Sequence, residues 1–177
     1  DRLANVVEEL ESSGVAEVSD GALVVFDEKD KKKEKVPLII RKSDGGFLYA
    51  TTDLAAVDYR SKELKANRVL YVTDAGQSGH FKAVFQAAQR SQELGDMSLE
   101  HVPFGLVQGE DGKKFATRSG ETVRLKDLLD EAESRCLTEL QERDSDADDL
   151  HELAKVVGIG AVKYADLSLN RESNYKF

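Results

Sequence analysis

The sequence predicts an α/β fold, in which a parallel sheet with helices on both faces is followed by a helical region. Strand-like and helical segments alternate along residues 36–107, an order that is typical of parallel sheets. The run Arg68-Val69-Leu70-Tyr71-Val72-Thr73 is almost continuously apolar, as buried parallel strands are. From Leu125 onward only helical periodicity is found. Ligands of such sheets bind beyond the carboxyl ends of the strands, so we expect functional residues in the loops there.

Residues 1–35 are expected to form a first segment. Apolar residues recur at helical spacing between Leu3 and Leu10, which predicts a short helix. Ser19-Asp20-Gly21 lies between two short apolar runs and predicts a β-hairpin. Residues 27–35 carry charges and no apolar side chain, which is typical of a solvated loop or linker.

Residues 36–125 contain the predicted sheet. Pro37 lies near the start of an apolar run, where a strand tolerates a missing N–H. Thr51 and Thr52 are residue types that cap helices, and they predict a helix from about Asp53 to Leu64. The remaining elements expected from apolar spacing are strands at 36–41, 47–50, 68–73 and within 99–107, and a helix around 81–88.

Residues 126–177 form a third, helical segment. Apolar side chains recur at helical spacing from Leu125 to Leu140 and again from Leu150 to Val162. The acidic stretch 144–149 separates the two patterns and predicts a loop.

Composition and charge argue against several classes of protein. The chain has 177 residues and a formal net charge of −9, whereas proteins that coat nucleic acids are usually basic. Any RNA contact therefore has to be local or lie on other parts of a longer protein. The single cysteine, Cys136, cannot form an internal disulfide, which favours a reducing compartment such as the cytoplasm. No stretch approaches the roughly 18 apolar residues of a membrane span, and no signal peptide is visible. The sequence also shows no nucleophile triad and no cluster of metal ligands.

Tyr49 and Asp53 lie where a predicted strand passes into a helix. A carboxylate is favourable at a helix N-terminus. One interpretation is therefore that Asp53 is a helix cap and has no functional role. Alternatively, its carboxylate points into the crevice and pairs with a cationic substrate, while Tyr49 packs against the same ligand. The residues alone leave both interpretations open.

Gln77 and His80 come directly after the buried strand, close to Gly76 and Gly79. The two glycines allow a ligand to approach the backbone, but their spacing differs from the G-x-G-x-x-G of dinucleotide-binding proteins. Gln77 offers amide donors and an acceptor. His80 could equally be a structural histidine.

A glycine-bracketed loop, residues 109–120, carries Lys113, Lys114, Thr117 and Arg118. Lysine and arginine provide charge and N–H donors for phosphate oxygens, so the loop is a candidate lid over a triphosphate. A phosphate-binding P-loop is excluded, because its first glycine and its Ser or Thr are missing. The remaining alternative is an ordinary surface hairpin.

Three ordered motifs resemble arginyl-tRNA synthetase, a class I aminoacyl-tRNA synthetase. The motifs are Tyr49-Ala50-Thr51-Thr52-Asp53-Leu54-Ala55-Ala56, then Tyr71-Val72-Thr73-Asp74 with Gln77 and His80, and then Lys114-Phe115-Ala116-Thr117-Arg118-Ser119-Gly120-Glu121-Thr122-Val123. The similarity covers about Pro37 to Phe177, whereas residues 1–35 match more loosely and resemble an insertion within the catalytic domain. It implies a Rossmann-like class I catalytic core, of which the second half is present, and the start of the helical region after it.

The resemblance also implies an activity and a set of site residues. The whole enzyme would activate L-arginine with ATP, assisted by Mg²⁺, and transfer the arginyl group to tRNA(Arg). A guanidinium needs a carboxylate and planar acceptors, which the arginine pocket would take from Tyr49, Asp53 and Gln77. The ATP contacts would come from His80, from backbone groups at Leu106 and Val107, and from Lys113. The catalytic loop over the pyrophosphate, the KMSKS signature of the class, would hold Lys114, Thr117 and Arg118.

The sequence departs from the family's pattern in three respects. Thr117 stands where the loop usually has its second lysine, and neither the His-x-Gly-His signature nor the anticodon-binding helical bundle is present. We therefore expect a fragment that does not activate arginine alone. The alternative is a non-catalytic, synthetase-derived module that binds RNA or protein; a start codon near Asp1 would favour it, whereas an upstream His-x-Gly-His would favour the ligase.

Overall fold

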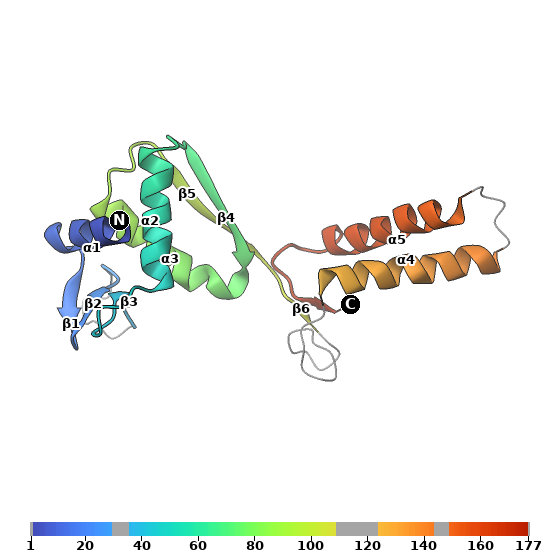
Figure 1. The fold of residues 1–177 in the computed structure, drawn as a ribbon, viewed down its shortest axis with the longest axis horizontal. Helices are drawn as coiled ribbons and strands as arrows, with labels where there is room; N and C mark the ends of the chain where they lie inside the picture. The colour runs from blue at the N-terminus through green and yellow to red at the C-terminus, as the bar shows by residue number, and fades with distance from the viewer. Residues whose placement is uncertain (1, 30–35, 109–123, 144–148, 177) are drawn as a thin grey trace. The chain divides into compact units, whose positions relative to one another are not determined.

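The computed structural model describes residues 2–29, 36–108, 124–143 and 149–176. The chain divides into two compact units, Asp1–Pro103 and Phe104–Phe177 (Figure 1). None of the described helices is both long and apolar enough to cross a membrane.

The first unit begins with a helix and a three-stranded sheet. Helix α1 (Arg2–Ser12) is followed by β1 (Glu17–Ser19), β2 (Ala22–Val25) and β3 (Leu38–Arg41), and the strand order is β1-β2-β3. Asp20 and Gly21 join β1 to β2 with φ angles of 48° and 77°, the two positive values that a tight type I′ turn requires. The hairpin expected at this position is therefore confirmed.

Strand β3 corrects one expectation. Residues 36–41 were predicted to join the parallel sheet, but β3 pairs with β2 and runs antiparallel to it. The β1–β2 hairpin presents a free edge that the chain reaches again after the charged segment, and pairing there leaves Ile40 fully buried in the core. The strand expected at 47–50 is reduced to a single bridge between Arg41 and Phe47.

Helix α2 (Tyr49–Lys62) begins four residues earlier than the sequence pattern predicted. Its N-terminal turn is held by Thr51, whose hydroxyl accepts the N–H of Leu48 at 3.4 Å and donates to the buried carbonyl of Ile40. Thr51 therefore caps the helix from within its first turn, where it was expected to precede the helix. As a consequence, Asp53 lies in the second turn of α2, beyond the strand-to-helix junction where it was expected.

A β–helix–β unit comes next along the chain. It consists of β4 (Arg68–Asp74), the short 3-10 helix η1 (Ala75–Gln77), α3 (Ser78–Ser91) and β5 (Ser98–Phe104). The N–H of Ser98 donates to the carbonyl of Asn67 at 2.9 Å, and Arg68 contacts Glu100. Since both strands start at the same end, β4 and β5 run parallel, as the apolar run predicted.

Within the first unit, helices cover one face of this strand pair. Tyr71 of β4 packs on Phe81 and Phe85 of α3, with ring centroids 4.9 and 5.1 Å apart. The alternate residues Leu70 and Val72 are 50% and 61% exposed. The helix cover expected on the second face is therefore not supplied by the described residues of this unit.

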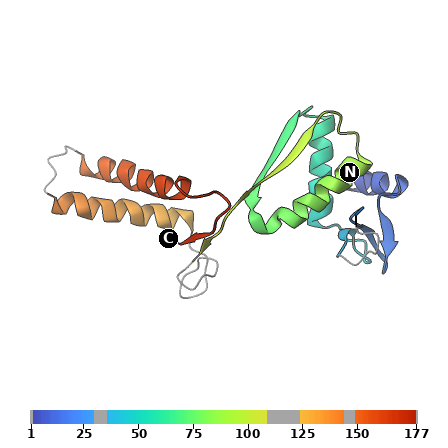
Figure 2. The ribbon, with the colours of Figure 1, turned by 180° about the vertical axis from the view of Figure 1, so that it is seen from behind.

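One hydrophobic core is shared by α1, β2, β3, α2, β4 and α3. Figure 2 shows the ribbon of these elements from behind. Helix α1 contributes to the same core as the β–helix–β unit, so residues of the 1–35 segment pack against residues 36–103. The fully buried apolar side chains of this core include Leu10, Ile40, Leu54, Val57 and Val84.

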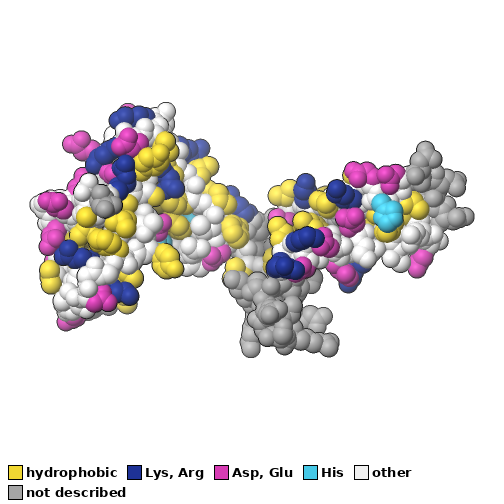
Figure 3. Space-filling view, viewed as in Figure 1, with side chains coloured by type: hydrophobic (Ala, Val, Ile, Leu, Met, Phe, Trp, Pro, Cys, Tyr) yellow, Lys and Arg dark blue, Asp and Glu magenta, His cyan; other side chains and the backbone are white. Residues whose placement is uncertain are grey.

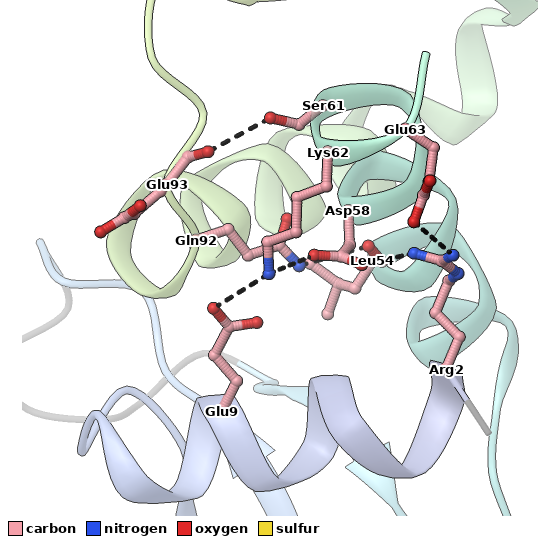
Figure 4. Close-up of polar contacts among 9 residues, drawn as sticks. All are labelled: Arg2, Glu9, Leu54, Asp58, Ser61, Lys62, Glu63, Gln92 and Glu93. Carbon is pink, nitrogen blue, oxygen red and sulfur yellow. Dashed lines mark hydrogen bonds and ion pairs between the residues drawn. The ribbon is translucent and has the colours of Figure 1, made fainter. Parts of the chain in front are cut away.

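A buried carboxylate ties α1 to α2 (Figure 4). The side chain of Asp58 is 8% exposed and pairs with Arg2 at 2.9 Å and with Lys62 at 2.6 Å. The hydrogen bond from each cation to Asp58 raises the pKa of both Arg2 and Lys62 above their ordinary values. Beside it, Gln92 donates from Nε2 to the carbonyl of Leu54 at 3.2 Å and so anchors the end of α3 to α2.

The second unit contains a helical hairpin and a short strand pair. Helices α4 (Leu125–Glu142) and α5 (Leu150–Leu167) pack side by side, and β6 (Val107–Gln108) pairs in parallel with β7 (Tyr175–Lys176). Asp149 caps α5 by accepting the N–H of Glu152 at 3.0 Å. The two helices predicted from periodicity are confirmed. On the face of this hairpin that Figure 3 shows, acidic, basic and hydrophobic side chains are interspersed.

Candidate functional site

The centre of the candidate site is a contact between Asp53 and His80. Asp53 comes from the second turn of α2 and His80 from the first turn of α3. The Nε2 atom of His80 lies 2.7 Å from Oδ2 of Asp53, and the side chains of His80 and Asp53 are 31% and 30% exposed. An ionised carboxylate can only accept hydrogen bonds, so Nε2 carries the hydrogen and donates it. The pair is thus a charge-assisted contact at the surface of the α2–α3 junction.

Aromatic packing holds the imidazole of His80 in place. Its ring meets Phe81 edge-on at 5.2 Å, and Phe81 stacks on His101 of β5, also at 5.2 Å. His101 in turn lies 2.8 Å from the hydroxyl of Thr73 at the end of β4. His101 was not predicted from the sequence; the only signal was a polar residue within an otherwise strand-like segment. The site therefore draws on four elements, α2, α3, β4 and β5.

Gln77 lies at the end of η1, directly before α3. Its amide Nε2 donates to Oδ2 of Asp74 at 2.6 Å, and Oδ1 of Asp74 accepts the N–H of Gly76 at 3.0 Å. A Cβ atom at Gly76 would meet that carboxylate oxygen at 2.8 Å. Gly76 thus allows the close approach of Asp74, and this turn orients the amide of Gln77.

Tyr49 opens α2 and is 87% exposed. It precedes Asp53 by four residues, so the two side chains lie on the same face of the helix, one turn apart. The structure therefore brings Asp53 and His80 into contact, and places Tyr49 on α2 and Gln77 directly before α3. A pocket shared by Tyr49, Asp53 and Gln77 remains a prediction.

Tyr71 lies under the same region of α2. Its hydroxyl accepts a hydrogen bond from Nη1 of Arg60 at 3.0 Å. Burial raises the pKa of Tyr71 above its ordinary value, while Arg60 acts in the opposite direction and the charge of Asp53 adds to the increase. The negative charge of Asp53 therefore contributes to the raised pKa of Tyr71.

The second unit contains the residues expected to contact adenine. The N–H of Leu106 donates to Oδ1 of Asn174 at 2.7 Å, and Val107 pairs with Tyr175 in the β6–β7 ladder. The N–H of Leu106 is thus used within the unit, and contact with adenine stays a prediction for the other backbone groups of Leu106 and Val107.

The candidate lid lies outside the described residues, and so do Lys113, Lys114, Thr117 and Arg118. The helix on its carboxyl side is described: α4 starts at Leu125, as expected for a loop that leads into a helix. Among the described residues, no group of three or more His, Cys, Asp or Glu side chains is arranged to hold a metal ion.

Comparison with known proteins agrees with the resemblance found in the three sequence motifs. An arginine–tRNA ligase of Picosynechococcus sp. is 56% identical over 184 residues, and one of Nostoc punctiforme is 53% identical over the same length. Each alignment covers 99% of this chain and 32% of the relative. The chain therefore spans about a third of the length of these ligases.

Solved structures confirm the α/β fold class. The arginyl-tRNA synthetase of Plasmodium falciparum superposes with a TM-score of 0.78 at 32% identity, covering 99% of this chain and 29% of that one. The Thermus thermophilus arginyl-tRNA synthetase, at 18% identity and a TM-score of 0.72, covers 99% of this chain and 35% of that one, and supports the fold alone. The family described as class I tRNA synthetases (R), catalytic domain, matches residues 1–177. The chain belongs to this family of class I synthetase catalytic domains.

Proposed function

We propose that the protein containing this chain is an arginine–tRNA ligase, which activates L-arginine with ATP and transfers the arginyl group to tRNA(Arg) in the cytoplasm. The observation that carries the proposal is the partly exposed carboxylate of Asp53, held at the α2–α3 junction on a helix that also carries an exposed tyrosine. Membership of the synthetase family and ligase relatives at 53–56% identity support it.

Asp53 is the proposed partner of the substrate guanidinium. A carboxylate offers two acceptor oxygens to the planar fork of N–H donors, which gives both charge and orientation. Tyr49, one turn earlier on α2, would pack against the substrate, and Gln77 would bind from the η1–α3 turn. This pocket selects arginine over lysine through geometry, because an ammonium group cannot form the paired contact.

The proposed reaction is the in-line attack of the arginine carboxylate on the α-phosphate of ATP. Such a step needs positioning and charge neutralisation and no protein nucleophile. Mg²⁺ would accompany the triphosphate, since this ion is usually bound through substrate phosphates. The phosphate contacts are proposed for Lys113, Lys114, Thr117 and Arg118, and the adenine contacts for backbone groups of Leu106 and Val107.

Replacing Asp53 by Asn tests the pocket. The change keeps the shape of the side chain but removes its charge, so the KM for arginine should rise about 100-fold, in line with the loss of a strong charge-assisted contact. The KM for ATP should stay within about twofold, because the carboxylate does not serve the nucleotide in this proposal. The assay is arginine-dependent exchange of pyrophosphate into ATP by the full-length protein.

Asp20→Asn is the matched control. Asp20 lies in the β1–β2 turn with a φ of 48°, a conformation that Asn adopts readily, so the same chemical change should leave both KM values unaltered. Equal losses for arginine and ATP in Asp53→Asn, or none in either, would contradict a guanidinium pocket at Asp53.

A further inference from the structure

The contact between Asp53 and His80 assigns a second role at the proposed pocket. We propose that His80 is a positioning residue for arginine: its Nε2–H holds Oδ2 of Asp53 and leaves Oδ1 directed to the guanidinium. The inference rests on the proposed function, since it needs Asp53 to be the arginine partner. It adds a residue that acts on the substrate only through that carboxylate.

The first support is the geometry of the pair. The distance of 2.7 Å between Nε2 and Oδ2 is typical of a hydrogen bond to a charged acceptor. Within the described part of the chain, the contacts of Asp53 involve Oδ2, and Oδ1 has no hydrogen-bond partner. Each carboxylate oxygen has two acceptor sites, so Oδ2 keeps one and Oδ1 keeps both for the N–H groups of a guanidinium that reaches this 30% exposed side chain.

The second support is the rigidity of the imidazole. His80 is on a helix, and its ring packs against the buried Phe81, which stacks on His101, itself held by Thr73. Functional groups act best when their own rotamers are locked by packing and by further hydrogen bonds. This arrangement restricts rotation of His80 and, through it, rotation of the Asp53 carboxylate.

A direct contact between His80 and the nucleotide is the competing interpretation. In the structure the Nε2 atom is already used by Asp53, so a nucleotide would have to meet Nδ1 or displace the carboxylate. The two interpretations differ in which substrate suffers when the imidazole is removed. A positioning residue affects arginine, whereas a nucleotide contact affects ATP.

The experiment compares His80→Ala and His80→Gln in the full-length protein by pyrophosphate exchange. His80→Ala should raise the KM for arginine about tenfold, the effect of losing about 1.4 kcal/mol from a charge-assisted hydrogen bond. The KM for ATP should change by less than about twofold. Glutamine can bring its own amide N–H near the position of Nε2, so His80→Gln should recover most of the arginine affinity.

A double-mutant cycle with Asp53→Asn completes the test. If His80 acts through Asp53, then His80→Ala should change the KM for arginine by less than about twofold in the Asp53→Asn background, because contacting residues are not additive. Thermal unfolding of each variant reports any general loss of structure.

Three outcomes would overturn the inference: a rise in the KM for ATP with an unchanged KM for arginine, full additivity in the cycle, or a loss of thermal stability without a change in either KM. Failure of the proposed function is distinguishable, since Asp53→Asn alone would then leave the KM for arginine unchanged.

Discussion

Two glycines of α5, only two residues apart, should respond in opposite ways to the same substitution. A Cβ atom added to Gly158 would lie 2.8 Å from the carbonyl oxygen of Ala132 and 3.0 Å from Cα of Glu133, both in the backbone of α4. A Cβ atom added to Gly160 would meet no atom within 4 Å. Gly158 therefore marks the close approach of the two helices, whereas Gly160 faces open space.

The expected magnitudes depend on two competing terms. Alanine is favoured over glycine within a helix by about 1 kcal/mol, so Gly160→Ala should increase the free energy of unfolding by about that amount. Gly158→Ala has the same advantage in helix propensity. However, α4 and α5 have to separate to admit the methyl group, and overpacking of this kind costs about 1–3 kcal/mol. The net change at Gly158 should lie between about zero and a loss of about 2 kcal/mol.

Hydrogen exchange of the α4 and α5 amides measures this difference directly, because local opening reports the stability of the helical hairpin. We expect slower exchange in Gly160→Ala and equal or faster exchange in Gly158→Ala than in the unaltered chain. Equal protection by both substitutions would refute the reasoning, since it would mean that the helices do not need the missing side chain at Gly158.

Two further predictions concern the first unit. Thr51→Val should lower the free energy of unfolding by about 1–3 kcal/mol, because it leaves the buried carbonyl of Ile40 without its donor. The same change at the exposed neighbour Thr52 should cost less than about 0.5 kcal/mol, and urea unfolding that finds equal effects would contradict this. Burial raises the pKa of Tyr71 above its ordinary value near 10, so the hydroxyl loses its proton at a lower pH in the unfolded chain than in the folded one. The contribution of Tyr71 to the free energy of unfolding is therefore complete below about pH 10 and is lost as the pH rises toward the folded pKa. Tyr71→Phe should make the decrease between about pH 9 and 11 smaller, as measured by urea unfolding at both values.

Local sequence signals predicted the elements that depend on a few neighbouring residues. The Asp20-Gly21 turn is explained by residue types that tolerate positive φ, and the helices around Phe81, Leu125 and Leu150 by apolar spacing. The motifs of the synthetase family also lie within short stretches of chain, so the fold class could be expected before the structure was known.

The errors arose where a partner is distant along the chain. The start of α2 was misplaced because Thr51 was expected to precede the helix, whereas it lies in the first turn, where its hydroxyl accepts the N–H of Leu48 and donates to Ile40, eleven residues earlier. The strand at 36–41 was assigned to the parallel sheet, since a strand's pattern does not state which edge it will join. The pairing with β2 depends on the position of the hairpin.

For this chain, the order of residues was sufficient to establish the helices, the hairpin and the family, because these depend on turn chemistry, periodicity and motif spacing. The contact of Asp53 with His80 could not be predicted from the sequence. The two residues are 27 positions apart, and they meet only because α2 and α3 pack against each other. That packing, with Phe81 and His101 behind the imidazole, decides how His80 meets the carboxylate of Asp53.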